Sequence, residues 1–336
     1  MAEERSDGLC ACGRTPLGQP FLRQVAAISE RPWTGEAFGL SIASAVSLPG
    51  LARGPASGGP RPLLIDVVPR LESSGGERLV EWRDSAGDIG LVIESDERGF
   101  QFEVRGAGRY ELSADGRRAR CAPAPETGFS WRRYLIGQVL PFAALLQGLE
   151  VFHASAVALD GEVIALAAGT GVGKSTLALN LHLAGAGFVT DDVLAVEVVG
   201  DTPLVHPGLG VAKVRRAATE LVDPAALGAP ATSDAHELRY LVEPAPQPLP
   251  LGTFCVLDHA ADGVVRVRET DTPPFRLLAS TFNLVVGTPE RLASQLSVCA
   301  VIARHARVLT AAVPDRPDER AAARLRELLT ADRLAA

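Results

Sequence analysis

The chain has 336 residues, of which 47% are hydrophobic and 22% are charged, and its formal net charge is −7. This length accommodates two domains of ordinary size, and the composition is that of a globular protein with a packed core. The basic residues are dispersed along the chain, whereas a nucleic-acid-binding surface requires them to cluster on one face. We therefore expect no nucleic-acid partner.

The cysteines and the first residues bear on the compartment of the protein. The five cysteines lack the paired CxxC spacing of a zinc site. Cys10 and Cys12 lie in a polar stretch over residues 1–20, which we predict to be a mobile leader with free thiols. This leader has an acidic start and no apolar core, and the apolar stretch at 134–149 is too short to span a membrane. We expect a cytoplasmic protein without membrane association.

Residues 21–125 are predicted to form a mainly β N-terminal domain. Short apolar runs alternate there with turn residues, which is typical of antiparallel strands. The runs lie at 38–42, 63–68, 91–94, 100–104 and 110–112. Asp96–Gly99 and Asp115–Gly116 supply hairpin turns.

The next segment contains a linker and a helix. Residues 122–126 read Ala-Pro-Ala-Pro-Glu, and proline stiffens the chain and removes backbone donors from a sheet. We place the domain boundary near residue 125, so that 126–336 holds the following helix and the second domain. The helix is predicted over 131–147, ends at Gly148 and closes the β domain.

The second domain begins with a strand, a turn and a second strand. Residues 151–159 are apolar and carry His153, Asp160–Gly161 forms the turn, and a strand at 163–168 follows. This second strand leads directly into a glycine-rich loop, and a helix is predicted at 175–184. Strand, glycine loop and helix therefore occur in the order that a P-loop requires.

The glycine-rich loop is a candidate phosphate site of the Walker A type. Its glycines allow successive backbone N–H groups to point at phosphate oxygens, and the dipole of the following helix favours negative charge. Lys174 is expected to reach the β and γ phosphates of ATP, and the Ser175 hydroxyl is expected to bind Mg²⁺. The predicted nucleotide-binding residues are Gly169, Thr170, Gly171, Val172, Gly173, Lys174, Ser175 and Thr176.

The use of lysine supports this interpretation. Of 33 basic residues only Lys174 and Lys213 are lysine, and one of these two lies in the loop. Arginine is used everywhere else, and a planar guanidinium fits less well between phosphates than a compact ammonium group.

Three acidic or titratable residues are candidates for the chemistry. Asp191 and Asp192 follow a short strand at 188–190, where a mononucleotide-binding fold brings a carboxylate to the metal. We expect Asp192 to accept the proton of a substrate hydroxyl and Asp191 to contact the metal or its water, with the reverse order as the alternative. His153 is expected near the γ phosphate, because its strand pairs with the strand that enters the loop. The alternatives are a surface turn for the acidic pair and a core histidine for His153.

The rest of the chain is predicted to contain strands and two closing helices. Strands are expected at 193–199 and 254–257, separated by a segment that includes His206–Gly210. One helix begins at Thr288 and another near Asp315. The apolar positions expected to face inward are Leu292, Leu296, Cys299 and Ala303 in the first helix and Leu325, Leu328 and Leu329 in the second.

Three segments resemble the catalytic domain of HPr serine kinase/phosphorylase and the wider HprK-related kinases. They are Phe152–Val157, Ala168–Thr176 and Gly187–Leu194, within a stretch of about residues 148–330. The resemblance implies an α/β fold with a P-loop domain of the HPr kinase/PEP carboxykinase type behind a mainly β domain. It also implies that His153, Asp191 and Asp192 lie at a phosphoryl-transfer centre. The N-terminal stretch Phe38–Leu51 is similar to HprK-related proteins found beside peptide-maturation genes.

The sequence departs from this family at one point. Family members carry a Glu-Ile-Arg-Gly-x-Gly signature whose glutamate helps to hold metal, and this chain has Val205-His-Pro-Gly-Leu-Gly210 instead. HPr is therefore doubtful as the substrate. Lys213 and Arg239 are the remaining candidate cations for phosphate or transition-state charge, with a solvated side chain as the alternative for each.

These observations predict an ATP- and Mg²⁺-dependent kinase that phosphorylates a hydroxyl, most readily the serine of a protein or of a biosynthetic precursor peptide. A homo-oligomer is compatible with the sequence. One alternative is a nucleotide-gated peptide-binding protein that transfers no phosphoryl group. Another is a kinase of a small hydroxyl metabolite.

Overall fold

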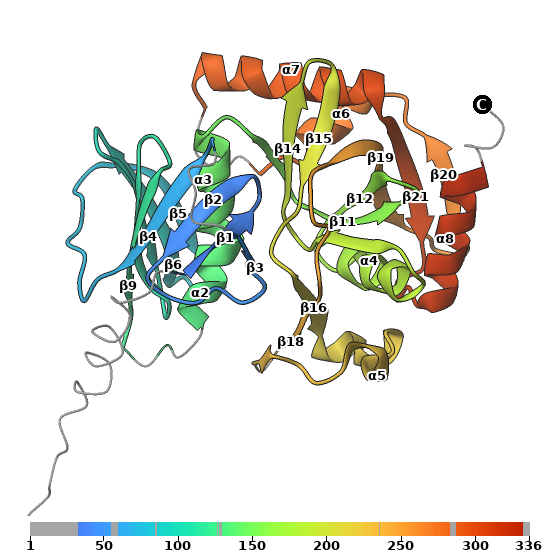
Figure 1. The fold of residues 1–336 in the computed structure, drawn as a ribbon, viewed down its shortest axis with the longest axis horizontal. Helices are drawn as coiled ribbons and strands as arrows, with labels where there is room; N and C mark the ends of the chain where they lie inside the picture. Colours follow the sequence, from blue (N-terminus) through green and yellow to red (C-terminus); the bar gives the residue numbers. More distant parts are fainter. Residues whose placement is uncertain are drawn as a thin grey trace, which may run out of the picture.

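The computed structural model describes residues 33–54, 60–84, 86–125, 127, 130–234, 236–282 and 287–331. The predicted leader, with Cys10 and Cys12, lies outside the described residues. The chain is a mixed α/β protein rich in sheet, with two nine-stranded sheets and a small three-stranded sheet (Figure 1). In the described part of the chain no helix is both long and apolar enough to cross a membrane.

The N-terminal sheet has the strand order β3-β1-β2-β4-β9-β8-β7-β6-β5. Its strands are β1 (Trp33–Ala37), β2 (Leu40–Ser44), β3 (Ala52–Arg53), β4 (Pro62–Val67), β5 (Glu77–Arg83), β6 (Ile89–Asp96), β7 (Gly99–Val104), β8 (Gly108–Ser113) and β9 (Arg118–Pro123). Both predicted hairpin turns are confirmed: Asp96 pairs with Gly99, and Gly116 turns with a φ of 69° between β8 and β9.

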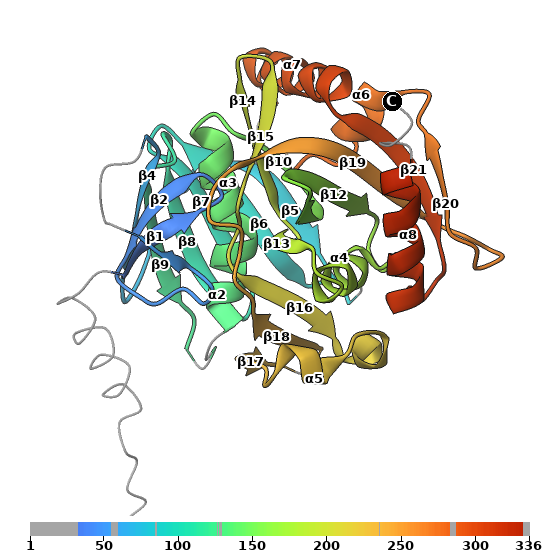
Figure 2. The same cartoon turned by 45° about the vertical axis from the view of Figure 1, so that its right-hand side comes forward.

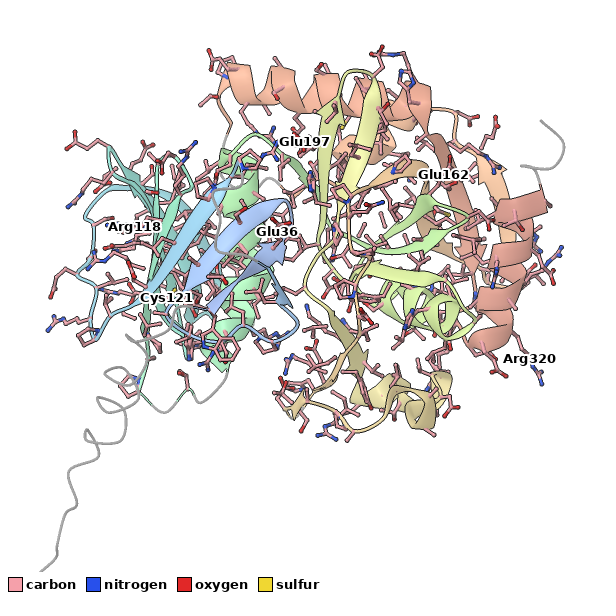
Figure 3. The ribbon with its side chains drawn as sticks, in the orientation of Figure 1. Glu36, Arg118, Cys121, Glu162, Glu197 and Arg320 are labelled. Atoms are coloured by element: carbon pink, nitrogen blue, oxygen red, sulfur yellow. The ribbon has the colours of Figure 1, made fainter. Side chains whose placement is uncertain are left out.

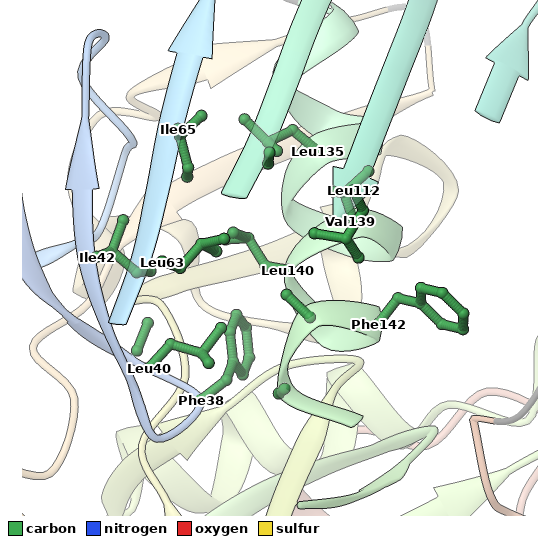
Figure 4. Close-up of a cluster of buried hydrophobic side chains, with 14 of the residues drawn as sticks. Phe38, Leu40, Ile42, Leu63, Ile65, Leu112, Leu135, Val139, Leu140 and Phe142 are labelled. Carbon is green, nitrogen blue, oxygen red and sulfur yellow. The ribbon is translucent and has the colours of Figure 1, made fainter. Parts of the chain in front are cut away.

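A continuous helical segment covers one face of this sheet. It consists of α2 (Ser130–Tyr134), a π-helical turn η1 (Leu135–Val139) and α3 (Leu140–Leu146). Its apolar side chains pack with those of the strands in one core (Figure 4). The Tyr110 hydroxyl of β8 donates a hydrogen bond of 2.8 Å to the Trp131 carbonyl. The predicted domain boundary near residue 125 therefore assigns this helix to the second domain, although the helix packs on the sheet of the first.

The second sheet contains both antiparallel and parallel strands. Its strands are β10 (Glu150–Phe152), β11 (Ala154–Leu159), β12 (Glu162–Ala168), β13 (Gly187–Thr190), β14 (Leu194–Val199), β15 (Thr202–His206), β19 (Leu249–His259), β20 (Arg266–Glu269) and β21 (Arg307–Val313). The prediction of one continuous strand over 151–159 is wrong. The chain changes partner at His153, because β10 pairs with β14 whereas β11 pairs with β12 and β13.

Helices cover both faces of this sheet (Figure 1). Alternate residues of β12 point to opposite faces, as a strand requires, so that Ile164 and Leu166 pack on one side and Val163, Ala165 and Ala167 on the other. The first side is covered by α4 (Lys174–Leu183) and α8 (Glu319–Ala331), and the second by α6 (Pro273–Leu278) and α7 (Pro289–His305). The inward position of Leu325 and Leu329 in α8 is confirmed.

The orientation expected for the first half of α7 is wrong. Leu292 and Leu296 are 48% and 51% exposed. Glu150 is buried beneath this helix, and the Arg291 guanidinium lies 2.6 Å from its carboxylate. A buried carboxylate requires a charged or hydrogen-bonding partner. Arg291 and the buried Gln295 therefore face inward, and the two leucines are left on the outside.

A third, small sheet extends from one end of the second one. It consists of β16 (Val211–Arg215), β18 (Glu237–Leu241) and β17 (Thr232–Ser233), and the short helices η2 (Arg216–Leu221) and α5 (Pro224–Leu227) lie in the same segment. The lower end of the α2 helix lies beside β16 and β18 (Figure 2). The Arg133 guanidinium and the Glu237 carboxylate form an ion pair of 3.5 Å there.

The two large sheets are joined by the β1–β2 hairpin and by a partly buried ion pair. The Phe38 N–H donates to the Pro207 carbonyl over 2.7 Å. Arg61, the residue before β4, pairs with Glu197 of β14, whose position between the two sheets is labelled in Figure 3. His206 of β15 lies 2.8 Å from the same carboxylate. The His206–Gly210 segment thus holds the N-terminal sheet in place.

We expect Arg61→Gln to lower the free energy of unfolding by about 1 kcal/mol at pH 7, as judged by urea denaturation. Burial alone would raise the pKa of Glu197, but the hydrogen bonds from Arg61 and His206 lower it below its usual value. A carboxylate with a lowered folded-state pKa stabilises the protein above its unfolded pKa of about 4.3, and this contribution is lost as the pH falls. The difference between variant and wild type should therefore shrink below about pH 4.

The matched control is Arg70→Gln. Arg70 and Glu72 also form an ion pair, but their side chains are 79% and 76% exposed. An exposed pair contributes little, so we expect a change of less than about 0.5 kcal/mol at either pH. Equal effects of the two substitutions would contradict the role of Arg61 in joining the sheets.

Candidate functional site

Strand direction brings the predicted site residues to one edge of the second sheet. β11 is antiparallel to both β12 and β13, so β12 and β13 run in the same direction. The glycine loop after β12 (residues 168–176) and the Asp191–Asp192 pair after β13 therefore emerge at the same edge. His153 precedes β11, whose first residue pairs with the end of β12, so it lies at this edge too.

The glycine loop begins α4 with an unusual backbone. Gly171 and Gly173 have φ values of 93° and 105°, a region that side chains with a Cβ rarely adopt. A Cβ on Gly173 would lie 2.4 Å from the Pro317 side chain, whereas a Cβ on Gly169 or Gly171 would meet open space. Glycine is thus required at 173 both by its conformation and by the close approach of Pro317. Val172 faces away from the edge and is buried in the core with α4.

A cavity of about 420 Å³ lies in front of the loop. It brings together most of the residues predicted from the sequence, whereas Val172, Asp191 and Arg239 do not line it. The predicted residues that line it are His153, Gly169, Thr170, Gly171, Gly173, Lys174, Ser175, Thr176, Asp192 and Lys213.

Asp192 lies between the two lysines of the chain. One carboxylate oxygen accepts a hydrogen bond from Lys174 Nζ, and the other accepts one of 2.7 Å from Lys213 Nζ. Burial would raise the pKa of Asp192, but the two ammonium groups outweigh it and hold the pKa far below its usual range. Burial likewise opposes the charge of Lys213, and the two aspartates offset it and raise the pKa of Lys213. Asp192 and Lys213 are therefore both charged at neutral pH.

Asp191 turns away from the cavity. Its carboxylate accepts hydrogen bonds of 2.7 Å from the Ser155 hydroxyl and 3.0 Å from the Lys213 backbone N–H. Burial and the neighbouring Asp192 carboxylate raise the pKa of Asp191. The expected metal contact of Asp191 does not agree with this position. Its two oxygens instead connect β11, β13 and β16, and thereby fix where Asp192 and Lys213 lie.

The backbone of Asp192 adopts an uncommon conformation. Its φ of 68° is uncommon for any residue other than glycine, although aspartate tolerates it better than most. The Asp192 N–H lies 3.4 Å from the Ser155 hydroxyl oxygen that also bonds Asp191. Such conformations persist where the surroundings enforce them, and they concentrate at functional sites.

His153 faces the same cavity from the start of β11. Its backbone N–H donates to the Ser280 carbonyl over 2.8 Å, which fixes the bend between β10 and β11. Burial and the nearby Lys174 ammonium lower the pKa of His153, and Asp192 only partly offsets them. The imidazole is therefore neutral at pH 7 and able to exchange a proton with a group in the cavity.

The structure does not bring Arg239 to the cavity. Its guanidinium pairs with Asp234 at 2.8 Å and with Glu237 at 3.0 Å within the small sheet. These two carboxylates neutralise its charge. The role expected for Arg239 in binding phosphate is therefore not supported by its position, because neighbouring residues of its own sheet already supply it with acidic partners.

Two arginines at the cavity were not singled out from the sequence. Arg215 ends β16 and is exposed, and it forms no ion pair among the described residues. Arg316 lies in the loop after β21 and pairs with Glu220. β12, β19 and β21 are parallel, and loops after parallel strands meet at the same edge. The Pro-Asp-Arg-Pro sequence directly after an apolar strand was thus a usable signal for Arg316.

The residues present fit a nucleotide with Mg²⁺ better than a metal held by protein alone. No group of three or more His, Cys, Asp or Glu side chains in the described ranges is arranged to hold a metal ion. The Ser175 hydroxyl and the Asp192 carboxylate line the same cavity. Mg²⁺ commonly takes one or two protein oxygens and obtains the rest from phosphates and water, which suits this donor set.

Comparison with known proteins adds little to this geometry. No family model and no curated protein matches the sequence. Among solved structures, the Hpr(Ser) kinase/phosphatase from Coxiella burnetii aligns weakly with the chain, with a TM-score of 0.29 and 12% identity over 55% of this chain and 97% of that one. A likeness this weak carries no inference about this chain.

We expect Lys213→Met to raise the pKa of Asp192 by about one pH unit or more, because the carboxylate loses one of its two ammonium partners. The measurement is a ¹³C NMR titration of the labelled aspartate carboxyl groups. Arg304→Gln, on the exposed surface of α7, removes a positive charge elsewhere and should leave the Asp192 titration unchanged. An unchanged titration in Lys213→Met would contradict the paired arrangement.

Proposed function

We propose that the chain is a P-loop kinase of the HprK-related type that transfers the γ-phosphoryl group of ATP to a hydroxyl, preferably the serine of a protein or peptide. The observation that carries this proposal is the cavity shared by the glycine loop, His153, Asp192 and Lys213. A phosphate-binding loop opposite an ionised carboxylate is the arrangement that phosphoryl transfer to a hydroxyl needs.

The loop would bind the phosphates through its backbone. The N–H groups of 169–175 and the N-terminal end of the α4 dipole favour negative charge at this point. The open space above Gly169 and Gly171 allows a phosphate to approach the backbone closely. Arg215 and Arg316 line the same cavity and would add positive charge around the phosphates.

Lys174 links nucleotide binding to the state of Asp192. A phosphate at the loop would compete with Asp192 for the Lys174 ammonium group, which now bonds one carboxylate oxygen. Once Lys174 moves to the phosphate, Asp192 keeps only Lys213, and its basicity rises. ATP binding would thus prepare the carboxylate for its role.

Asp192 would act as the base in the transfer itself. The acceptor hydroxyl oxygen forms a bond to the γ phosphorus while the bond from phosphorus to the β–γ bridging oxygen breaks, and ADP leaves with that electron pair. The hydroxyl proton passes to the Asp192 carboxylate and then to solvent. Lys213 would stabilise the charge that develops, and the neutral His153 at the cavity wall would assist proton movement.

The Ser175 hydroxyl would hold Mg²⁺ together with phosphate oxygens and water, and the bound ion would neutralise phosphate charge. Asp191 would act through its hydrogen bonds to Ser155 and the Lys213 backbone. It therefore positions the reacting groups and does not touch them. The natural acceptor on this proposal is a protein or a precursor peptide.

Asp192→Asn tests the proposed base. We expect transfer from γ-labelled ATP to fall by about 10²–10⁴-fold, because no carboxylate remains to accept the proton. ATP affinity measured without Mg²⁺ should be retained or increased, because Lys174 no longer bonds a competing carboxylate. Asp201→Asn, in the exposed turn between β14 and β15, is the matched control and should behave as the wild type. Transfer at the wild-type rate would remove Asp192 as base and favour a nucleotide-gated binding protein.

Lys174→Ala tests the phosphate site. Loss of the ammonium group should reduce ATP affinity, measured by calorimetry, by at least about tenfold, since a charged hydrogen bond contributes about 1.5–3 kcal/mol. Arg304→Ala is the control for removal of a positive charge outside the cavity. ATP affinity that survives Lys174→Ala would contradict the P-loop assignment itself.

A further inference from the structure

A second, mostly apolar pocket lies between the N-terminal sheet and the small sheet. We call it the joint pocket. It has a volume of about 40 Å³ and receives residues from the β1–β2 hairpin, from the α2–η1 helix and from β16–β18. Its apolar wall consists of Phe38, Pro49, Ile136, Val193, Leu209, Val211 and Leu241. The proposed nucleotide site uses none of these side chains.

The joint pocket adjoins the nucleotide cavity at the catalytic residues. Lys213 lines both of them. Asp191 lines the joint pocket, and the next residue, Asp192, lines the nucleotide cavity. A group bound in the joint pocket is therefore separated from the proposed base by one residue of backbone and one lysine side chain.

The helical wall of the pocket is irregular at this point. Ile136 and Gly137 lie in the π-helical turn η1, and such turns occur frequently at functional sites. A Cβ placed on Gly137 would meet no atom within 4 Å apart from its chain neighbours and the backbone of its own helix. The helix therefore leaves open space where a side chain at 137 would otherwise stand.

The charges around the pocket are already paired. The Lys213 ammonium bonds Asp192, Arg239 bonds Asp234 and Glu237, and Arg133 pairs with Glu237 across the rim. The Asp191 carboxylate accepts hydrogen bonds from the Ser155 hydroxyl and the Lys213 backbone N–H. A charged ligand would gain no free counter-ion from these groups, whereas an apolar group would cover the apolar wall. A water molecule needs about 10–15 Å³ of cavity volume. The joint pocket therefore has room for about three water molecules, which together are about the size of a branched aliphatic side chain.

We infer that the joint pocket binds one aliphatic side chain of the phosphoryl acceptor, of the size of valine or leucine, and so presents a nearby hydroxyl to Asp192. This inference rests on the proposed kinase function. It assigns the N-terminal sheet and its helix a direct part in choosing the acceptor, because Phe38, Pro49 and Ile136 form one side of the pocket.

The test uses the full chain, γ-labelled ATP and a positional peptide library with one fixed serine. At each other position the library holds Leu, Asn or Trp, so that Asn supplies a polar group of similar size and Trp a group too large for the pocket. The wild type should prefer Leu at one position over Asn by about ten- to hundredfold in kcat/KM, the gain expected for burying one aliphatic side chain.

Two substitutions remove the pocket in different ways. Gly137→Leu fills it from the helix, where the added side chain begins in open space. Leu241→Ser removes part of its apolar wall, and Leu241 is 58% exposed, so the change spares the core. Both should lose the Leu preference and keep wild-type ATP affinity. Val264→Ser replaces a similarly exposed apolar residue, at 51%, in the turn before β20 and should retain the preference.

The outcomes separate this inference from the function on which it rests. Transfer without a preference for Leu, or a preference that persists in both pocket variants, overturns the joint pocket and leaves the kinase intact. Absence of transfer to every peptide, with ATP bound normally, overturns both. If Gly137→Leu loses ATP binding through misfolding, Leu241→Ser decides the result.

Discussion

The hydrogen-bonded cluster of Asp192, Lys174 and Lys213 is the interaction on which the rest of the site depends. Three charged groups are brought together at one edge of the sheet, and each is costly to bury without the others. Their placement requires the glycine loop and the aspartate pair to emerge on the same side, which follows from β11 being antiparallel to both β12 and β13. Asp191 and Ser155 complete the arrangement by fixing the backbone around it.

This cluster also gives the proposed mechanism its order of events. The Lys174 ammonium group cannot bond a phosphate and the Asp192 carboxylate fully at the same time. Binding of a phosphate therefore weakens the bond between Lys174 and Asp192. The proposed base is held at low basicity by two ammonium groups and regains basicity when one of them turns to the nucleotide. In such a kinase, Asp192 would become an effective base only when ATP is bound.

The N-terminal sheet acts on the site through its joint with the second sheet. The Phe38 hairpin, the Arg61–Glu197 pair and the segment at 206–210 hold the two sheets together, and the joint pocket lies where these elements meet the small sheet. The segment that departs from the resembled family is thus used here for packing: a Cβ on Gly208 would fall within 3 Å of both Thr190 and Phe38. The contacts that hold the two sheets together therefore also form the pocket proposed to select the acceptor.

The sequence by itself determined the features that are encoded locally. These are the glycine loop between a strand and a helix, the hairpins of the first sheet, the helix at 131–147 and the group of His153, Lys174, Asp192 and Lys213. Neighbouring residues fix the backbone conformation within each of these elements, and the pairing of β11 with both β12 and β13 then brings the glycine loop, His153 and Asp192 to one edge. Only the tertiary structure decided which way Asp191 points and that Arg215 reaches the cavity. It also turned Leu292 and Leu296 outward, because the buried Glu150 needs Arg291. Asp191 and Arg291 take their orientations from partners far away in the sequence, Ser155 with Lys213 for the first and Glu150 for the second, and no local pattern of residues records those partners.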